Sequence, residues 1–326
     1  MRQKIIIGFS VLLLLLAVVL ISYDLFHESP RQTAPNVLTK QTNALKDIDP
    51  SLVAYNQIQT IEVGIKSPKG IAVDDNKIFV CGENQVIIYS TSGTEISVFT
   101  IDSSANCIEV RNNKIYLGTG SDVESYASDG KFVGLFESMS DKGLITSIAT
   151  DSDFIYVADA INKTVLKYSY EGKLEGEIGG RDSLQRKKGF VIPSPYFDVV
   201  AGGYSDIWAA NTGYLRLENF SSSGALRTMW GKASYDNDGF PGCCNPAHFC
   251  LLPDGSFVTY EKGLDKVKVF DPAGQFKCLV AGAGSFKGDA DFLLGRKNLG
   301  KDLDTGQRGN IYILDAYNRI CIFKEV

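Results

Sequence analysis

Three cysteines and one histidine stand close together in a turn-rich segment, and their types could support metal or thiol chemistry. Cys243 and Cys244 are adjacent within the string FPGCCNP, and His248 and Cys250 follow with one residue between them. Residues two apart in a strand point to the same side. Thiolate and imidazole groups are ligands for soft metals, so this group could bind Zn²⁺ or Cu(I).

Other interpretations of these cysteines remain open. Cys243 and Cys244 could form a strained, easily reduced vicinal disulfide, or one of them could pair with a distant cysteine. They could also be plain thiols, because the spacing matches no familiar zinc motif. The remaining cysteines lie in predicted strands among apolar neighbours and are expected to fill the core: Cys81, Cys107, Cys278 and Cys321.

Composition argues against several classes of function. The chain of 326 residues has a net charge of −5, which is unlike the basic footprint of a nucleic-acid-binding protein. It contains only two histidines, His27 and His248, and has no G-x-S-x-G, H-E-x-x-H or P-loop motif. The sequence therefore favours non-catalytic binding over enzymatic activity.

The elements that must position these residues are short strands in a recurring pattern. The first copy has four alternating apolar runs, 70–73, 77–81, 85–90 and 95–101, separated by turn residues. The second run of each copy carries an aromatic residue: Phe79, Tyr116, Tyr156, Trp208, Phe257 and Tyr312. The third run ends on another: Tyr89, Tyr126, Tyr168, Phe220, Phe270 and Phe323. The turn after the third run places glycine at 93, 130, 172, 224 and 274, where a positive φ is expected.

A four-stranded repeat of about 40–50 residues is typical of a β-propeller blade, and six copies predict an all-β, six-bladed propeller. The sixth copy lacks its fourth run, whereas residues 57–63, ahead of the first copy, resemble one. The N-terminal segment is therefore expected to complete the last blade and remove its open edges. Truncation to residue 66 should unfold the domain, and truncation to residue 45 should not.

The repeat resembles the NHL-repeat family over about residues 57–326. The strings GIAVDDNKIFV and IATDSDFIYVADAINKTVLKY carry this resemblance. The string PGCCNPAHFCLLPDGSFVTYEKGLDKVKVFD is similar to one in membrane-anchored or secreted bacterial NHL proteins of unassigned activity. The resemblance implies a binding platform, because only a minority of related six-bladed propellers are hydrolases, lyases or synthases.

One face of the ring is expected to carry the function. Long links between blades, at 181–195, 232–246 and 283–300, extend the face that also holds the loops joining second to third strands. A polar ligand or a protein partner would bind there. Candidate ligand-binding residues are Arg181, Asn211, Arg216, His248, Glu261, Lys262 and Arg319, with Arg186, Lys187 and Lys188 adding charge.

A calcium-dependent hydrolase or lyase is a further alternative. Some related propellers hold Ca²⁺ in the channel through carboxylate and amide oxygens. Four such residues lie near the predicted starts of inner strands: Asn106, Asp198, Asn245 and Asp302. No cofactor is required by the sequence, and Zn, Cu or Ca is possible.

The N-terminus predicts a membrane anchor. Residues 5–21 form an uncharged apolar run, with Arg2 and Lys4 before it and Asp24 after it. The run suits a single span with a cytoplasmic N-terminus, which places the propeller outside the cytoplasm, and it is long for a cleaved signal peptide. We expect a signal anchor over 1–23, a flexible tether over 24–50 and the propeller over 51–326.

Overall fold

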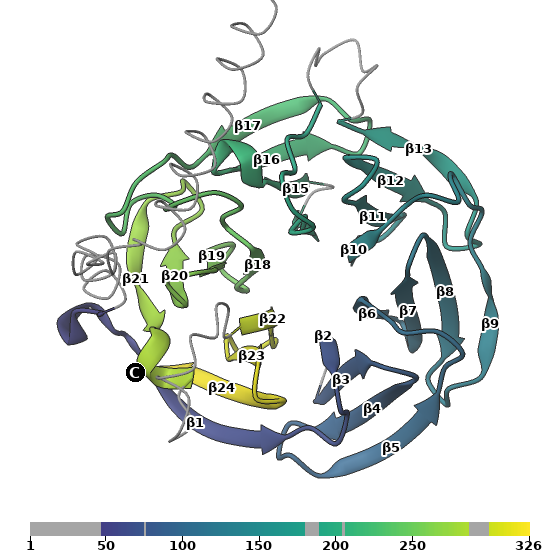
Figure 1. Cartoon of the computed structure of the whole chain (residues 1–326), viewed down its shortest axis with the longest axis horizontal. Helices are drawn as coiled ribbons and strands as arrows, with labels where there is room; N and C mark the ends of the chain where they lie inside the picture. The colour runs from purple at the N-terminus through teal and green to yellow at the C-terminus, as the bar shows by residue number, and fades with distance from the viewer. Residues whose placement is uncertain (1–46, 75, 180–188, 204–205, 287–299) are drawn as a thin grey trace, which may run out of the picture. The chain divides into compact units, whose positions relative to one another are not determined.

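The computed structural model describes residues 47–74, 76–179, 189–203, 206–286 and 300–326. Residues Leu45–Val326 form one compact unit, in which six four-stranded sheets surround a central axis (Figure 1). In the described ranges, no helix is long and apolar enough to cross a membrane. The expected anchor lies outside these ranges, as do residues 24–46 of the tether.

Each blade is an antiparallel sheet whose first strand lines the axis. The first three blades consist of β2 (Pro68–Asp74), β3 (Lys77–Gly82), β4 (Gln85–Ser90) and β5 (Glu95–Thr100); β6 (Cys107–Arg111), β7 (Lys114–Thr119), β8 (Asp122–Ala127) and β9 (Phe132–Leu135); and β10 (Ile145–Thr150), β11 (Ile155–Asp159), β12 (Thr164–Tyr168) and β13 (Leu174–Ile178).

The other three blades follow in chain order. They consist of β14 (Val199–Ala201), β15 (Asp206–Asn211), β16 (Arg216–Ser221) and β17 (Leu226–Trp230); β18 (His248–Leu251), β19 (Phe257–Glu261), β20 (Lys266–Phe270) and β21 (Phe276–Ala281); and β22 (Gly300–Thr305), β23 (Ile311–Asp315), β24 (Arg319–Glu325) and β1 (Tyr55–Glu62). The described 3₁₀ turns are η1 (Pro50–Leu52), η3 (Thr212–Tyr214) and η4 (Ala283–Phe286).

The predicted closure of the ring is confirmed. Strand β1 pairs antiparallel with β24, from Tyr55 opposite Glu325 to Glu62 opposite Arg319. The sixth blade thus takes three strands from the C-terminus and its outer strand from the N-terminal side of the domain. This arrangement leaves no blade without its fourth strand.

Turn chemistry follows the sequence prediction closely. All five glycines expected to need a positive φ have one, between 80° and 89°. Gly274 shows a second reason for glycine, because an added Cβ would lie 2.4 Å from Cγ of Trp230 in the preceding blade. These turns therefore set both the hairpin and the packing of one blade on the next.

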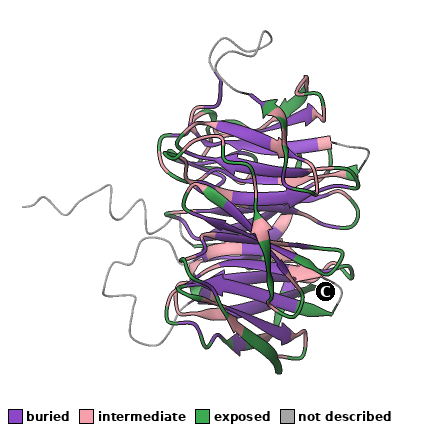
Figure 2. Ribbon diagram, turned by 90° about the vertical axis from the view of Figure 1, so that its right-hand side faces the viewer, coloured by how far each residue is buried: buried purple, intermediate pink, exposed green. Residues whose placement is uncertain are grey.

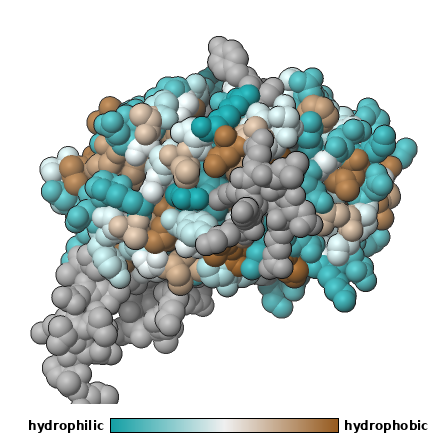
Figure 3. All heavy atoms as spheres, turned by 90° about the horizontal axis from the view of Figure 1, so that it is seen from above, coloured by the Kyte–Doolittle hydropathy of each residue, from teal (hydrophilic) through white to brown (hydrophobic). Residues whose placement is uncertain are grey.

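The core lies between adjacent blades (Figure 2). Ile71, Ile78 and Val80 of the first blade pack with Leu314 and Ile320 of the last, for example. Each fully buried aliphatic or aromatic side chain contributes about 1.5–3 kcal/mol. On the side of the domain drawn in Figure 3, the surface is largely hydrophilic, with scattered apolar side chains.

Side-chain hydrogen bonds join neighbouring blades at all six junctions around the axis. At three junctions a carboxylate accepts the bond. Asp302 and Asp304 accept from backbone amides of β2, Glu109 accepts from the hydroxyl of Thr150, and Asp198 accepts from the amide of Phe249. At the other three junctions, the ammonium of Lys69 donates to the side chain of Asn106, the amide of Val199 donates to the hydroxyl of Ser147, and the hydroxyl of Thr305 donates to the backbone oxygen of Leu251. The polar groups of the channel are therefore largely engaged in holding the ring together.

Candidate functional site

A pocket of about 450 Å³ lies at the mouth of the channel, where the inner strands begin. This is the face predicted from the long links, and the last residues of two links, Pro195 and Gly300, line the pocket together with the residues that follow them, Tyr196 and Lys301. The remaining lining residues are Ser67, Pro68, Lys69, Asn106, Leu144, Thr146, His248 and Asp302. Beneath it, a constriction of about 60 Å³ contains Glu109, Ser147, Asp198 and Asp304.

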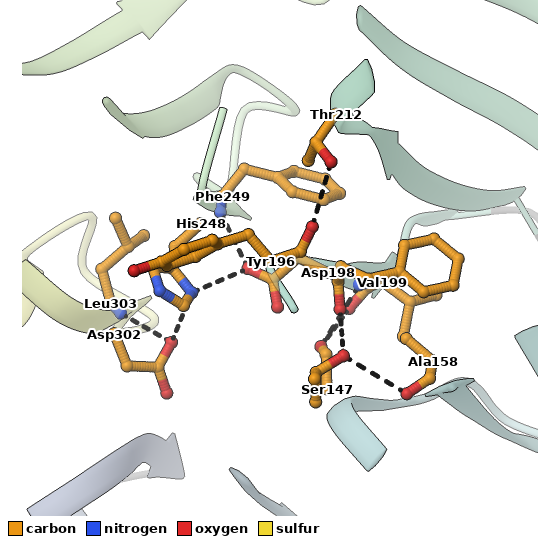
Figure 4. A network of polar contacts seen from close by, with 12 residues as sticks. Ser147, Ala158, Tyr196, Asp198, Val199, Thr212, His248, Phe249, Asp302 and Leu303 are labelled. Carbon is orange, nitrogen blue, oxygen red and sulfur yellow. Dashed lines mark hydrogen bonds and ion pairs between the residues drawn. The ribbon is translucent and has the colours of Figure 1, made fainter. Parts of the chain in front are cut away.

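His248 lies between two aspartates at the base of this pocket (Figure 4). Its Nδ1 is 3.4 Å from Oδ2 of Asp198 and 3.6 Å from Oδ1 of Asp302. Neither contact meets hydrogen-bond geometry, and Nδ1 is a buried nitrogen with no hydrogen-bond partner. The two carboxylates and the imidazole have their ligand atoms within 4.8 Å of one another.

The backbone explains why these three side chains meet. His248 begins β18, Asp198 directly precedes β14, and Asp302 lies in β22. The amide of Phe249 donates to Oδ2 of Asp198 at 3.1 Å. Asp302 accepts from the amides of Ile71 and Leu303, each at 2.9 Å. Both carboxylates are therefore fixed by backbone donors before any ligand arrives.

Burial and close charges shift the acid–base properties of this cluster. Burial raises the pKa of Asp302 to about 7, and nearby Asp198 adds to this, whereas His248 acts in the opposite direction. Burial acts to lower the pKa of His248, but Asp198 and Asp302 outweigh it and raise that pKa above its usual value. Negative charge is thus costly here, and a cation in the cluster is stabilised.

Lysines and an aromatic ring surround the mouth. The ammonium of Lys69 donates to the amide oxygen of Asn106 at 3.0 Å, and that of Lys301 donates to Asn318 at 2.9 Å. Lys262 places its ammonium 4.6 Å from the ring centroid of Tyr196. The same tyrosine ring packs edge-on against His248, at 5.9 Å between centroids.

Most of the predicted ligand-binding residues do not line the pocket. They form polar pairs with other side chains of their own blade, near the turn between its second and third strands. Asn211 is fully buried and bridges the Val191 amide to Glu218, which also pairs with Arg216 at 2.7 Å. Glu261 is buried against Lys268.

In the last blade, Arg319 pairs with buried Asp315 at 2.7 Å. These residues were expected to add side chains to the binding face, but Asn211 and Glu261 are buried. The cause is pairing within the blade and with the preceding link, because Asn211 bonds to Glu218 and Val191, and Glu261 pairs with Lys268. Of the seven candidates, His248 lines the pocket and Lys262 stands beside it, whereas Arg181 lies outside the described residues.

The cysteines do not join His248. All seven are free thiols, and Cys243 is exposed whereas Cys244 and Cys250 are buried. Cys250 packs in the core beside Val258. In the described part of the chain, the group of potential ligands that converges contains His248 and two aspartates but no cysteine.

The four residues considered as calcium ligands do not all lie together. Asp198 and Asp302 do converge, and Asn106 lines the same pocket. Asn245 does not, because its amide bonds to Pro241 and Lys262 and holds the 232–246 link in place. Sequence reasoning did not single out Lys69, Tyr196 or Lys301. Their shared signal is position, since each lies at or near the start of an inner strand.

Comparisons with known proteins support the fold. No family model and no curated protein matches the sequence. A streptogramin B lyase structure aligns with a TM-score of 0.57 and 13% identity, covering 83% of this chain and 98% of the other. Virginiamycin B lyase from Staphylococcus aureus gives 0.55 and 13%, covering 83% and 100%.

A third similar structure is the WD40 β-propeller domain of Doa1, with a TM-score of 0.54 and 12% identity, covering 84% of this chain and 98% of that one. The chain is a β-propeller. At these identities the likeness concerns the fold alone, and the function must be argued from the site.

Proposed function

We propose that this propeller is a binding protein for a small organic anion, which it holds at the mouth of the channel. The observation that carries this proposal is the 450 Å³ pocket with Lys69 and Lys301 in its wall. The described contact of the Lys69 ammonium is to a neutral amide oxygen, so that contact leaves its positive charge available. Tyr196, Pro68 and Pro195 supply an apolar wall for the body of the ligand.

The positive charge of Lys69 and Lys301, rather than the carboxylates of the floor, acts with the shape of the pocket to favour a carboxylate or phosphate on a compact organic body. The lysines can contact an anionic group while the tyrosine ring covers the rest of the molecule. His248 and the two aspartates form the floor. A concave site of this size, with a few polar groups among apolar ones, is typical of small-molecule recognition rather than of a flat protein interface.

The test uses full-length protein and a panel of acetate, malate, citrate and inorganic phosphate in thermal-shift and calorimetric titrations. At least one probe should stabilise the wild type, and Lys69→Gln should weaken its binding about tenfold. Lys114→Gln is the matched control, because Lys114 is exposed at the opposite end of an inner hairpin. Unchanged binding in Lys69→Gln, or no response to any probe, would contradict the proposal.

We further propose that the domain is an NHL-type propeller displayed outside the cytoplasm by an N-terminal anchor. The repeat strings and the apolar run at 5–21 support this placement. Membrane fractionation with alkaline extraction tests it. Full-length protein should remain in the pellet, and a variant with Leu14→Arg and Leu15→Arg should be released, whereas release of both would contradict anchoring.

A further inference from the structure

The cluster of Asp198, His248 and Asp302 has the donor set of a metal site. Imidazole nitrogen and carboxylate oxygen are ligands that Zn²⁺ accepts, and the three donors come from three different blades. The described group within 4.8 Å includes no thiolate, so this candidate is distinct from the cysteine-based site considered from sequence.

The distances fit a bound ion better than direct contact. Zinc bonds to nitrogen and oxygen are about 2.0–2.2 Å, and tetrahedral angles then place ligand atoms about 3.4 Å apart. Nδ1 of His248 is 3.4 Å and 3.6 Å from the two carboxylate oxygens. Those separations are too long for good hydrogen bonds, and they leave Nδ1 buried and without a partner.

The surroundings of the carboxylates support the same conclusion. Asp198 is oriented by the Phe249 amide, and Asp302 by the amides of Ile71 and Leu303. Outer hydrogen bonds of this kind hold ligands in place for a metal. The six-fold ring keeps the three strands at fixed separations, so binding would need little rearrangement.

We propose that Asp198, His248 and Asp302 bind one divalent transition-metal ion, with Zn²⁺ as the reference, and leave a coordination position open toward the pocket. This inference rests on the proposed function in one respect, because an anionic oxygen of the pocket's ligand would fill the open position. The imidazole donor favours Zn²⁺ over Ca²⁺, which prefers six to eight oxygen ligands.

The experiment measures metal binding without any organic ligand. Chelator-treated full-length protein is dialysed against Zn²⁺, and bound metal is measured by elemental analysis. A parallel titration with Co²⁺ is followed by visible absorption, which is intense for four-coordinate Co²⁺. We expect one equivalent of metal per chain, and His248→Gln and Asp302→Asn should each weaken binding at least tenfold, in line with loss of a metal ligand.

Two controls separate this site from other groups. Glu109→Gln changes a channel carboxyl that bonds to Thr150 and should leave metal binding intact. Cys244→Ser should also bind metal normally. Far-UV circular dichroism and a thermal melt verify folding, and a ligand variant that fails to fold is replaced by Asp198→Asn.

Several outcomes would overturn the inference. They are no metal binding by the wild type, equal binding by folded His248→Gln, or loss of binding in Cys244→Ser. If the wild type binds no metal, a protonated His248 held between the two carboxylates would explain the spacing of the three side chains. Failure of the anion titrations alongside stoichiometric Zn²⁺ binding would reject the proposed function and keep the metal site.

Discussion

The amide of Val73 donates a 2.7 Å hydrogen bond to Oδ2 of Asp304, although the two residues are 231 positions apart in the chain. Oδ1 of the same carboxyl accepts from the amide of Thr305, also at 2.7 Å. One side chain thus satisfies two backbone donors at the seam where the last blade meets the first. Burial raises the pKa of this carboxyl to about 7.

Asp304→Ala should therefore destabilise the ring. It leaves two channel amides without their acceptor, and a lost buried partner costs about 1–3 kcal/mol. Asp304→Asn keeps one acceptor oxygen and should cost less. Urea unfolding at pH 7 measures both, and equal costs for the two variants would show that the hydrogen bonds are not responsible.

Ring closure predicts a sharp difference between two truncations. Removal of residues 1–66 deletes β1, which covers β24 and supplies Ile61 to the core. The product should lack a cooperative thermal transition. Removal of residues 1–45 keeps β1 and η1 and should retain the transition. Thermal melts followed by circular dichroism measure both transitions. Cooperative unfolding of the fragment that lacks residues 1–66 would contradict this account of closure.

The fold could be predicted from the sequence because each blade repeats the same short-range sequence pattern. Alternation in strands, aromatic markers such as Tyr156, and glycines such as Gly274 at positive φ are all local signals. The matching half-blades at the two chain ends predicted the closure that Tyr55 and Glu325 show. None of these signals depends on contacts between distant residues.

The site was harder to predict because it is assembled from distant residues. Asp198, His248 and Asp302 were each noticed, but in two different hypotheses, and only the ring geometry brings them together. Asn211 and Glu261 have the residue types of a binding rim, yet both are buried, Asn211 against Glu218 and Glu261 against Lys268. Sequence spacing within one blade cannot separate a side chain that is buried in such a polar pair from one that reaches a ligand.

Stability should fall as pH rises toward 8. Burial in the channel raises the pKa of Glu109 to about 8 from an ordinary value of 4.5. The folded state then binds this proton more tightly than the unfolded state does, so the stabilisation is complete below pH 4.5 and is lost as pH approaches 8. The loss is at most about 1.4 kcal/mol per pH unit.

Glu109→Gln removes this titration and keeps an oxygen that can accept from Thr150. Urea unfolding of both proteins at pH 5, 6, 7 and 8 is the measurement. The free energy of unfolding should decline less steeply for Glu109→Gln than for the wild type. Parallel pH curves would show that Glu109 is already ionised in the folded protein.

The buried pair of Lys268 and Glu261 should be costly to break. Both side chains are 1% exposed, and Lys268 also donates to the backbone oxygens of Asn237 and Gly239 in the 232–246 link. Lys268→Met leaves a buried carboxyl without its partner, which costs about 3–5 kcal/mol. Glu261→Gln in the same chain should recover part of that loss, and a double variant no more stable than Lys268→Met would exclude charge burial as the cause.

Adjacent thiols should react at very different rates. Cys243 is exposed, whereas Cys244 is 1% exposed and burial raises its pKa. Because the accessible thiolate is the nucleophile, a maleimide should label Cys243 first in the native reduced protein. Mass spectrometry of a time course measures this order. Cys243→Ser should remove the fast phase and Cys244→Ser should keep it, whereas a fast phase that survives Cys243→Ser would place the reactive thiol elsewhere.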